Sequence, residues 1–293
     1  MESASDRSVL LGHFRRLVVM PAPERLVIAR PGPLPDFPAQ CNPAARLVSI
    51  VDGKKRVWAA IDGKVAEASI TAETALFCAP HGWIAEDWTS PHEMLAIIYY
   101  ADFTRYLRIL NRGSAGDAEP DMEKQWHHTN RPPCDSVFHI LKALAAPDVT
   151  MRARVQLRGA LVELAAAELE RADGKPEDGK SASTWKIVRD FISEHFDEGI
   201  DRRTVARAMG ISPGHLSRLA VAHSGISFHE YVLRLRMERA QYLLERTSYS
   251  VKEIAGVCGF GDSARFIKVF AAAFGTSPGR FRCGAASEQA RDE

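Results

Sequence analysis

Residues 250–282 read SVKEIAGVCGFGDSARFIKVFAAAFGTSPGRFR, and this stretch decides the interpretation of the C-terminal part of the chain. Its apolar side chains recur at the i, i+3, i+4, i+7 and i+8 spacing of one helical face: Phe266, Val269, Phe270, Ala273 and Phe274. The cations Arg265 and Lys268 fall on the other side of the same helix. The pattern therefore predicts a short, firmly packed helix with two positive charges on its outer face.

The same pattern occurs earlier in the chain. When the sequence is shifted by 50 residues, LSRLAVAHSGIS (216–227) aligns with FIKVFAAAFGTS (266–277). Arg218 then aligns with Lys268, so the outward cation is repeated as well. A repeated unit of this length predicts one supersecondary motif used twice.

A turn precedes the second helix of each repeat. VARAMG (205–210) aligns with IAGVCG (254–259), and both segments end in glycine. Each repeat is therefore expected to be a helix, a turn at that glycine and a second helix. Between the repeats, FHEYVLRLRMERAQYLLERT (228–247) predicts one long connecting helix.

The expected helices have marked starts. Ser212 precedes Pro213, which fits a capping side chain followed by proline at the first helical position. Asp262 is the expected cap of the matching helix in the second repeat. Two further starts fit the S-x-x-E capping box, with Ser227 and Ser250 as the caps. These signals support an all-α region over residues 184–284.

Charge is distributed unevenly along the chain. Residues 183–283 contain 15 Lys and Arg against 10 Asp and Glu, whereas residues 1–182 contain 22 against 24. The net charge of the whole chain is only +1. A basic C-terminal part indicates that this end of the chain meets a polyanion.

These motifs together resemble the DNA-binding module of AraC/XylS-type bacterial transcription regulators. The matching elements, within residues 185–283, are S-x-x-x-L-S-R-L, R-x-x-x-A-x-x-L-L, I-A-x-x-x-G-F-x-D and F-G-T-S-P-x-x-F-R. The resemblance implies two helix-turn-helix units that enter successive major grooves of promoter DNA. It also implies an activator or repressor that works with RNA polymerase.

The expected DNA contacts lie on the outward faces of the two second helices. They are Gly214, His215, Ser217 and Arg218 in the first repeat, and Ser263, Ala264, Arg265 and Lys268 in the second. Small residues let a helix approach the duplex, and cations contact guanine edges or phosphates. The alternative is that Arg265 and Lys268 only form an ordinary solvent-exposed helix face and contact no DNA. Cations of the connecting helix, Arg234, Arg236 and Arg239, are expected to pair with Glu238 or Glu245 more often than with phosphate.

The N-terminal part predicts β structure followed by helices. Strand-like runs occur at 16–20, 25–29, 46–71, 74–80 and 94–100. Asp52-Gly53 and Asp62-Gly63 are hairpin signals, and residues 111–124 suggest a loop. Helical patterns follow at 134–146 and 151–172. We expect a barrel or sandwich followed by helices.

The segment ALFCAPHGWIAEDWTSPHEMLAIIYYADFTRYLRI (75–109) is weakly similar to the cupin-type sensor of the same family. That resemblance implies a cupin-like barrel that binds a small effector or forms a homodimer. Trp58, Trp83 and Tyr99 are candidates for lining an effector cavity, although most aromatic residues of this part are expected to be core.

An enzyme is the second hypothesis: a metal-dependent cupin enzyme that the C-terminal module tethers to DNA. This hypothesis rests on possible metal ligands in the N-terminal part: His81, His92, Glu93, His127 and His128. Their spacing does not match the usual cupin pattern, and no P-loop or nucleophile motif appears. We therefore expect no enzyme activity, no metal and no cofactor. A nonspecific architectural DNA binder is a third, weaker hypothesis.

Domain boundaries follow from composition. ADGKPEDGKSAS (172–183) predicts a linker between a sensor domain at 1–171 and a DNA-binding domain at 184–284, and residues 285–293 are expected to be a disordered tail. No signal peptide, membrane span or C-x-x-C pair is evident, so a cytoplasmic protein is expected.

Overall fold

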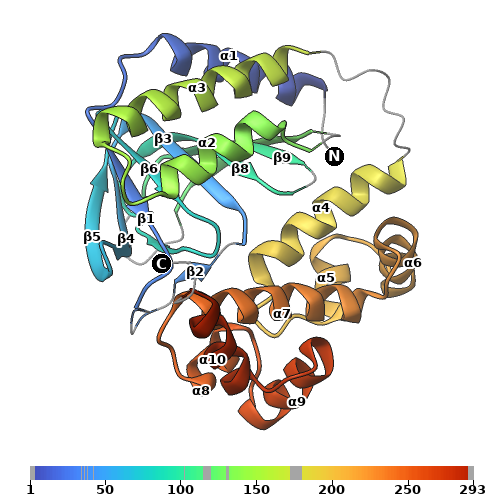
Figure 1. Cartoon of the computed structure of the whole chain (residues 1–293). Coiled ribbons are helices and arrows are strands. Elements are labelled where there is room, and N and C mark those ends of the chain that lie inside the picture. Colours follow the sequence, from blue (N-terminus) through green and yellow to red (C-terminus); the bar gives the residue numbers. More distant parts are fainter. Residues whose placement is uncertain are drawn as a thin grey trace. The chain divides into compact units, whose positions relative to one another are not determined.

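The computed structural model describes residues 4–33, 35, 37, 39–41, 43–101, 103–114, 120–129, 132–171 and 180–289. The chain divides into an N-terminal unit, Met1–Glu177, and a C-terminal unit, Asp178–Glu293 (Figure 1). Of the expected linker, residues 172–179 lie outside the described residues, and helix α4 begins at Lys180. Among the helices described, none is both long and apolar enough to span a membrane.

Two β-sheets form the centre of the N-terminal unit. The six-stranded sheet has the order β1 (Arg25–Ala29), β6 (Thr74–Cys78), β3 (Ala45–Gly53), β8 (His92–Tyr99), β9 (Thr104–Asn111) and β10 (Met122–His128). The four-stranded sheet has the order β2 (Gln40–Cys41), β7 (Trp83–Glu86), β4 (Lys55–Ile61) and β5 (Lys64–Ile70). Only the β1–β6 pair is parallel among these pairings.

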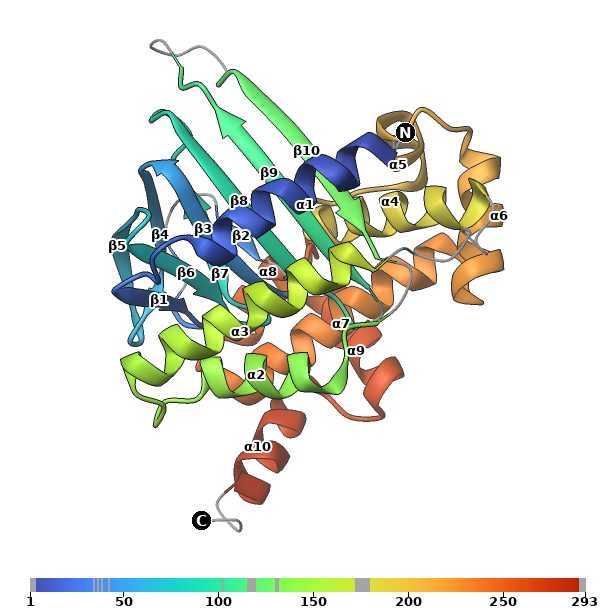
Figure 2. The ribbon, with the colours of Figure 1, turned by 90° about the horizontal axis from the view of Figure 1, so that it is seen from above.

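Three helices cover one face of the six-stranded sheet: α1 (Ala4–Val19), α2 (Asp135–Ala145) and α3 (Met151–Glu170). Figures 1 and 2 both show α1 and α3 side by side over this face. Strand β8 shows how the sheet serves two cores, because Leu95 and Ile97 pack toward the helices whereas Met94 and Ala96 pack toward the four-stranded sheet. This alternation follows from the two-residue period of a strand.

The predicted β-rich architecture is confirmed, but the predicted cupin-like barrel is not, because the described residues form two separate sheets and no closed barrel. The Asp62-Gly63 hairpin is confirmed: it joins β4 to β5, and both residues have positive φ, 49° and 77°. The Asp52-Gly53 hairpin prediction is wrong, because β3 and β4 belong to different sheets. Gly53 instead sits at a corner where a Cβ atom would lie 2.5 Å from the Pro91 carbonyl oxygen.

Two local predictions also differ from the structure. Residues 16–20, expected as a strand, fall largely within helix α1. The expected loop at 111–124 includes the start of strand β10, which pairs with β9 throughout. Both expected helices are confirmed as α2 and α3.

Seven helices make up the described part of the C-terminal unit. They are α4 (Lys180–His195), α5 (Arg202–Ala208), α6 (Pro213–Ser224), α7 (Phe228–Arg246), α8 (Val251–Val257), α9 (Ser263–Phe274) and α10 (Pro278–Gln289). One core joins α4, α5 and α6 to the first half of α7, and a second joins α8, α9 and α10 to the second half. Because α10 continues to Gln289, the predicted tail boundary at residue 285 does not coincide with the helix end; residues 290–293 lie outside the description.

Candidate nucleic-acid interface

The helix pairs α5–α6 and α8–α9 have the same turn. Gly210 and Gly259 have φ values of 63° and 74°. After each glycine a backbone N–H returns to the preceding helix: Ile211 N donates to Ala206 O at 3.0 Å, and Phe260 N donates to Ala255 O at 2.9 Å. The repeat in the sequence is thus a repeat in backbone geometry, offset by 49 residues in the turn.

The second helix of each pair is capped at both ends. The Ser212 hydroxyl accepts a hydrogen bond from His215 N at 3.1 Å. In the other pair the Asp262 carboxylate accepts from Ala264 N and Arg265 N at 3.1 and 3.0 Å, which lowers the pKa of Asp262. Gly225 and Gly275 end the two helices in the left-handed conformation.

One face of each of these helices packs inward. Leu216 and Leu219 of α6 are buried, as are Phe266 and Phe270 of α9. The Phe266 ring lies 5.3 Å from the Phe260 ring in an edge-to-face contact, which holds α9 against the turn that precedes it. The opposite faces are therefore fixed outward.

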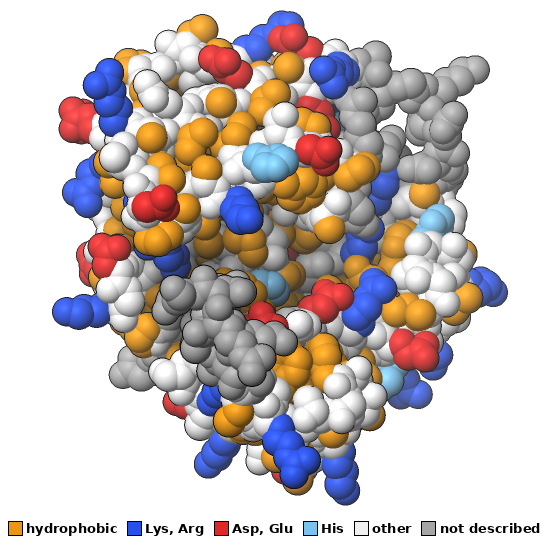
Figure 3. All heavy atoms as spheres, in the orientation of Figure 1, with side chains coloured by type: hydrophobic (Ala, Val, Ile, Leu, Met, Phe, Trp, Pro, Cys, Tyr) orange, Lys and Arg blue, Asp and Glu red, His pale blue; other side chains and the backbone are white. Residues whose placement is uncertain are grey.

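Arg218 and Lys268 are both exposed, at equivalent positions of α6 and α9. Gly214, Ala264 and Arg265 are exposed too. Three further predicted contact residues are half-buried: His215, Ser217 and Ser263. Figure 3 shows Lys and Arg side chains projecting from the surface around α8 and α9. The two outward faces are therefore cationic and carry few bulky side chains.

Ser217 is held within the domain. Its hydroxyl donates to the Pro213 carbonyl oxygen at 3.1 Å and accepts from Arg202 Nη1 at 3.2 Å. This side chain therefore positions Arg202, a residue that sequence reasoning did not single out. The repeat could not have revealed it, because the contact depends on how α5 packs on α6.

The cations of the connecting helix have internal roles. Arg234 pairs with Glu238 at 3.7 Å, as expected, although both side chains are largely exposed. Arg236 Nε donates to the Phe196 carbonyl oxygen at 2.8 Å, and burial lowers the pKa of Arg236. Arg239 is 1% exposed. The predicted pairing with acids thus holds for Arg234, whereas Arg236 binds backbone.

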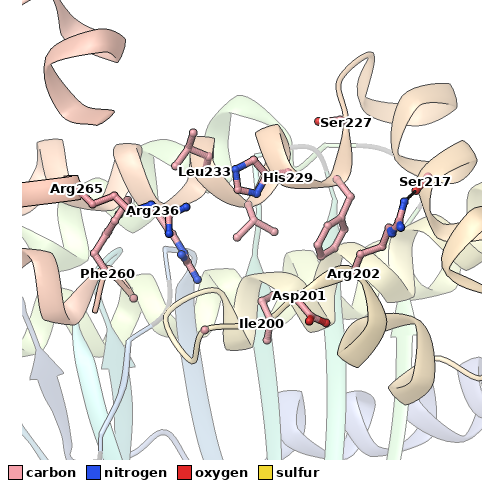
Figure 4. Close-up of a pocket in the computed structure, with 14 residues that line it drawn as sticks. Ile200, Asp201, Arg202, Ser217, Ser227, His229, Leu233, Arg236, Phe260 and Arg265 are labelled. Atoms are coloured by element: carbon pink, nitrogen blue, oxygen red, sulfur yellow. Dashed lines mark hydrogen bonds between the residues drawn. The ribbon is translucent and has the colours of Figure 1, made fainter. Parts of the chain in front are cut away.

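A pocket of about 530 Å³ lies between the two helix pairs (Figure 4). Its walls come from α5, α6, α7, the turn at Gly259 and α9. Arg202, His229, Arg236 and Arg265 line it. In Figure 4, Arg265 and Arg236 lie at one end and Arg202 with Ser217 at the other, with His229 between them.

The structure does not bring the three candidate effector residues together. Tyr99 packs into the core beneath the helices, and burial raises the pKa of its hydroxyl. Trp83 is also buried, and its indole N–H donates to the Pro33 carbonyl oxygen at 3.0 Å. Trp58 is half-buried against the ring of Phe37. The core interpretation fits Trp83 and Tyr99 better than a shared cavity does.

The metal hypothesis gains no support from the described residues, among which no group of three or more His, Cys, Asp or Glu side chains is placed to hold a metal ion. His92 Nδ1 contacts the Ser90 carbonyl oxygen at 2.8 Å, whereas Glu93 binds Arg108 Nε at 2.6 Å. His92 and Glu93 are adjacent on one strand, so their side chains point to opposite faces. They do not form a ligand pair.

A buried charged cluster that the sequence did not predict lies between the sheets. Lys55 Nζ is 3.0 Å from Glu86 Oε1 and 3.0 Å from the centre of the Trp88 ring. Burial lowers the pKa of Lys55 to about 8, and Glu86 limits the fall. Burial alone would raise the pKa of Glu86, but Lys55 and Arg46 outweigh it and the pKa is lowered. The two groups thus stabilise each other's charge.

Comparison with known proteins assigns the C-terminal unit. A family model described as a helix-turn-helix domain matches residues 205–283. The HTH-type transcriptional regulator YijO of Escherichia coli K12 is 27% identical over 258 residues, which cover 86% of this chain and 85% of that protein. The HTH-type transcriptional activator RhaS of Enterobacter is 38% identical over 94 residues, which cover 32% of this chain and 34% of RhaS.

A solved structure is also similar. It is a transcriptional regulator from Chromobacterium violaceum described as containing an AraC-type DNA-binding domain. It is 27% identical, with a TM-score of 0.34, and the match covers 36% of this chain and 95% of that one. This chain thus spans most of YijO but about a third of RhaS. The chain carries an AraC-type helix-turn-helix domain and is related to the transcription regulators of that type.

Proposed function

We propose that this chain regulates transcription by binding specific promoter sequences, with α6 and α9 as recognition helices in two successive major grooves. The observation that carries the proposal is the repeated geometry, in which two identically turned and similarly capped helix pairs expose Arg218 and Lys268 at equivalent positions. A helix reads a major groove when one face packs and the other is free.

Within this proposal the outward-facing residues make different kinds of contact with DNA. Arg218 reads a guanine through its two parallel N–H donors, and Lys268 reads a guanine or grips a phosphate. Gly214 and Ala264 are exposed near the helix starts, where the lack of a large side chain permits close approach. His215, Ser217, Ser263 and Arg265 complete the two contact surfaces.

The N-terminal unit is proposed as the regulatory part. It has its own cores, one beneath the helices and one between the sheets, so it is a separate compact structure. We assign to it the binding of a small effector or of a second copy of the chain. RNA polymerase is the proposed partner at the promoter, and the cytoplasm is the proposed compartment.

The test begins with selection of bound duplexes from a random DNA pool, followed by fluorescence anisotropy on the selected duplex and on a random one. Arg218→Ala is expected to reduce the preference for the selected duplex by about 1–3 kcal/mol, which is roughly 5- to 150-fold. Lys268→Ala tests the equivalent position.

Arg234→Ala is the matched control, because it removes one exposed cation that pairs with Glu238 on the connecting helix. It should leave the preference unchanged. Equal affinity of the wild-type protein for selected and random DNA would contradict specific recognition and indicate an architectural binder.

A further inference from the structure

The pocket between the helix pairs, here called the inter-pair groove, is defined by Arg202, Ser217, His229, Arg236 and Arg265. It is a concave pocket with a volume of about 530 Å³. Both proposed recognition helices contribute to it, α6 through Ser217 and α9 through Arg265. Its two ends are cationic, as Figure 4 shows. Nothing in the recognition of bases by Arg218 and Lys268 requires this groove.

The charge of the groove is unbalanced. Three arginines line it, whereas Asp201 is the single carboxylate among its lining residues. That carboxylate is engaged in capping α5, since it accepts from Arg203 N at 2.8 Å and from Thr204 N at 2.7 Å. Over the described part of the chain, neither Arg202 nor Arg265 forms an ion pair with an acid.

Two of the three arginines are also held in place by hydrogen bonds. The Ser217 hydroxyl positions the Arg202 guanidinium at 3.2 Å, and the Phe196 carbonyl oxygen fixes Arg236 at 2.8 Å. Burial lowers the pKa of Arg236, Asp197 opposes this, and the positive charge of Arg265 lowers the pKa further. Arg236 and Arg265 place like charges at one end of the groove, and Arg202 places a third positive charge at the other end, so the groove favours an anion that extends along it.

We propose that the inter-pair groove binds backbone phosphates of the DNA strand that passes between the two recognition helices, with Arg202 and Arg265 as the contacts. This inference rests on the proposed function, because two helices in successive major grooves leave the intervening backbone facing the surface between them. Phosphate contacts set the register of a protein on DNA and carry no base information. Arg265 accordingly holds the backbone, while Arg218 and Lys268 read bases.

The experiment measures affinity against salt concentration for the full chain on the selected duplex and on a random duplex. Each phosphate contact that is lost should flatten the slope of log affinity against log salt by about 0.9. Arg202→Gln and Arg265→Gln are each expected to flatten it by about that amount and to weaken binding to both duplexes by the same factor. Arg234→Gln, which removes an exposed cation outside the groove, should leave the slope unchanged.

A second measurement locates the phosphates. Neutral methylphosphonates are placed singly along the selected duplex between its two recognised segments. Wild-type binding should weaken at one or two positions, and the Arg202→Gln/Arg265→Gln double variant should be insensitive there. Unchanged circular dichroism and melting temperature confirm that the variants fold.

The outcomes separate the two proposals. If the arginine variants keep the wild-type salt slope, or the double variant stays sensitive to methylphosphonates, the groove assignment is overturned. Sequence preference that still depends on Arg218 would leave the proposed function intact in that case. If the wild-type protein shows no preference for the selected duplex, the proposed function itself fails.

Discussion

Gly210 and Gly259 occupy the same place in the two repeats, but their surroundings differ. Both have positive φ, a conformation that side chains with a Cβ atom disfavour. A Cβ atom at Gly210 would meet nothing within 4 Å, whereas one at Gly259 would lie 2.8 Å from the Asp197 carbonyl oxygen. Gly259 therefore serves two purposes, since it makes the turn and lets the second pair approach the loop after α4.

Gly210→Ala and Gly259→Ala make a matched test of this difference. Gly210→Ala is expected to cost about 1 kcal/mol, the strain of a left-handed alanine. Gly259→Ala should cost roughly 1–3 kcal/mol more, because backbone must shift to admit the new methyl group. Urea unfolding measures the free energy of unfolding of both variants. Equal decreases would show that the close contact with Asp197 does not affect stability.

Lys55 makes stability depend on pH on the alkaline side. Its pKa is about 8 in the folded chain, below the ordinary value of 10.5. Between these two values the unfolded chain binds more protons than the folded one, so stability should rise with pH from about 8 to 10.5. The full gain is on the order of 3 kcal/mol. Lys55→Met should remove this rise, which denaturation at pH 7.5 and 9.5 measures; a parallel rise in the variant would contradict the assignment.

At the scale of the element, α6 and α9 reach the same capped geometry with different residues, Ser212 and Asp262. Asp262→Ala should destabilise the C-terminal unit by about 1 kcal/mol, since two backbone N–H groups lose their acceptor. Asp262→Asn keeps an acceptor and should restore most of that stability. Urea unfolding at pH 7 compares the two variants, and equal losses in both would exclude capping as the role of Asp262.

Elements with local signals were predictable from the sequence. Capping residues, the Gly210 and Gly259 turns and the apolar face of α9 are all fixed by neighbours within one helical turn. The Asp62-Gly63 hairpin follows from the same kind of local chemistry. Asp52-Gly53 carries an identical signal but lies where the chain changes sheets, and partner strands far along the chain decide that outcome.

Helix α1 shows that a local sequence signal can also predict the wrong element. Its segment RLVVM contains two β-branched valines and predicts a strand, yet Leu10, Phe14 and Leu17 follow a helical spacing that fills the core against α3. Tertiary burial overrides local propensity there. The inter-pair groove could not be predicted for a related reason, because Arg202 and Arg236 meet the recognition helices only through packing.

At the scale of the whole molecule, α7 connects the two helix pairs and so sets the spacing of the proposed recognition helices α6 and α9. Its 19 residues span about 28 Å, and its two halves belong to the two cores of the C-terminal unit. The loop after α4 also contacts both parts: Arg236 of α7 donates to the Phe196 carbonyl oxygen, and Gly259 of the second pair approaches Asp197 closely. The two helix pairs therefore form one compact unit, and the proposed function requires this unit to hold α6 and α9 at the spacing of successive major grooves, about 34 Å.

This rigidity predicts how binding responds to insertions between the two recognised DNA segments. Five added base pairs move one segment by about 17 Å and half a turn, and ten move it by about 34 Å and a full turn. A rigid unit should lose its two-segment affinity with both insertions, because neither restores the original distance. Flexibly joined pairs would instead recover affinity with ten base pairs, where the segments again face the same side. Anisotropy on the three duplexes separates these cases, and Arg218→Ala and Lys268→Ala on the ten-base-pair duplex show which segment remains bound.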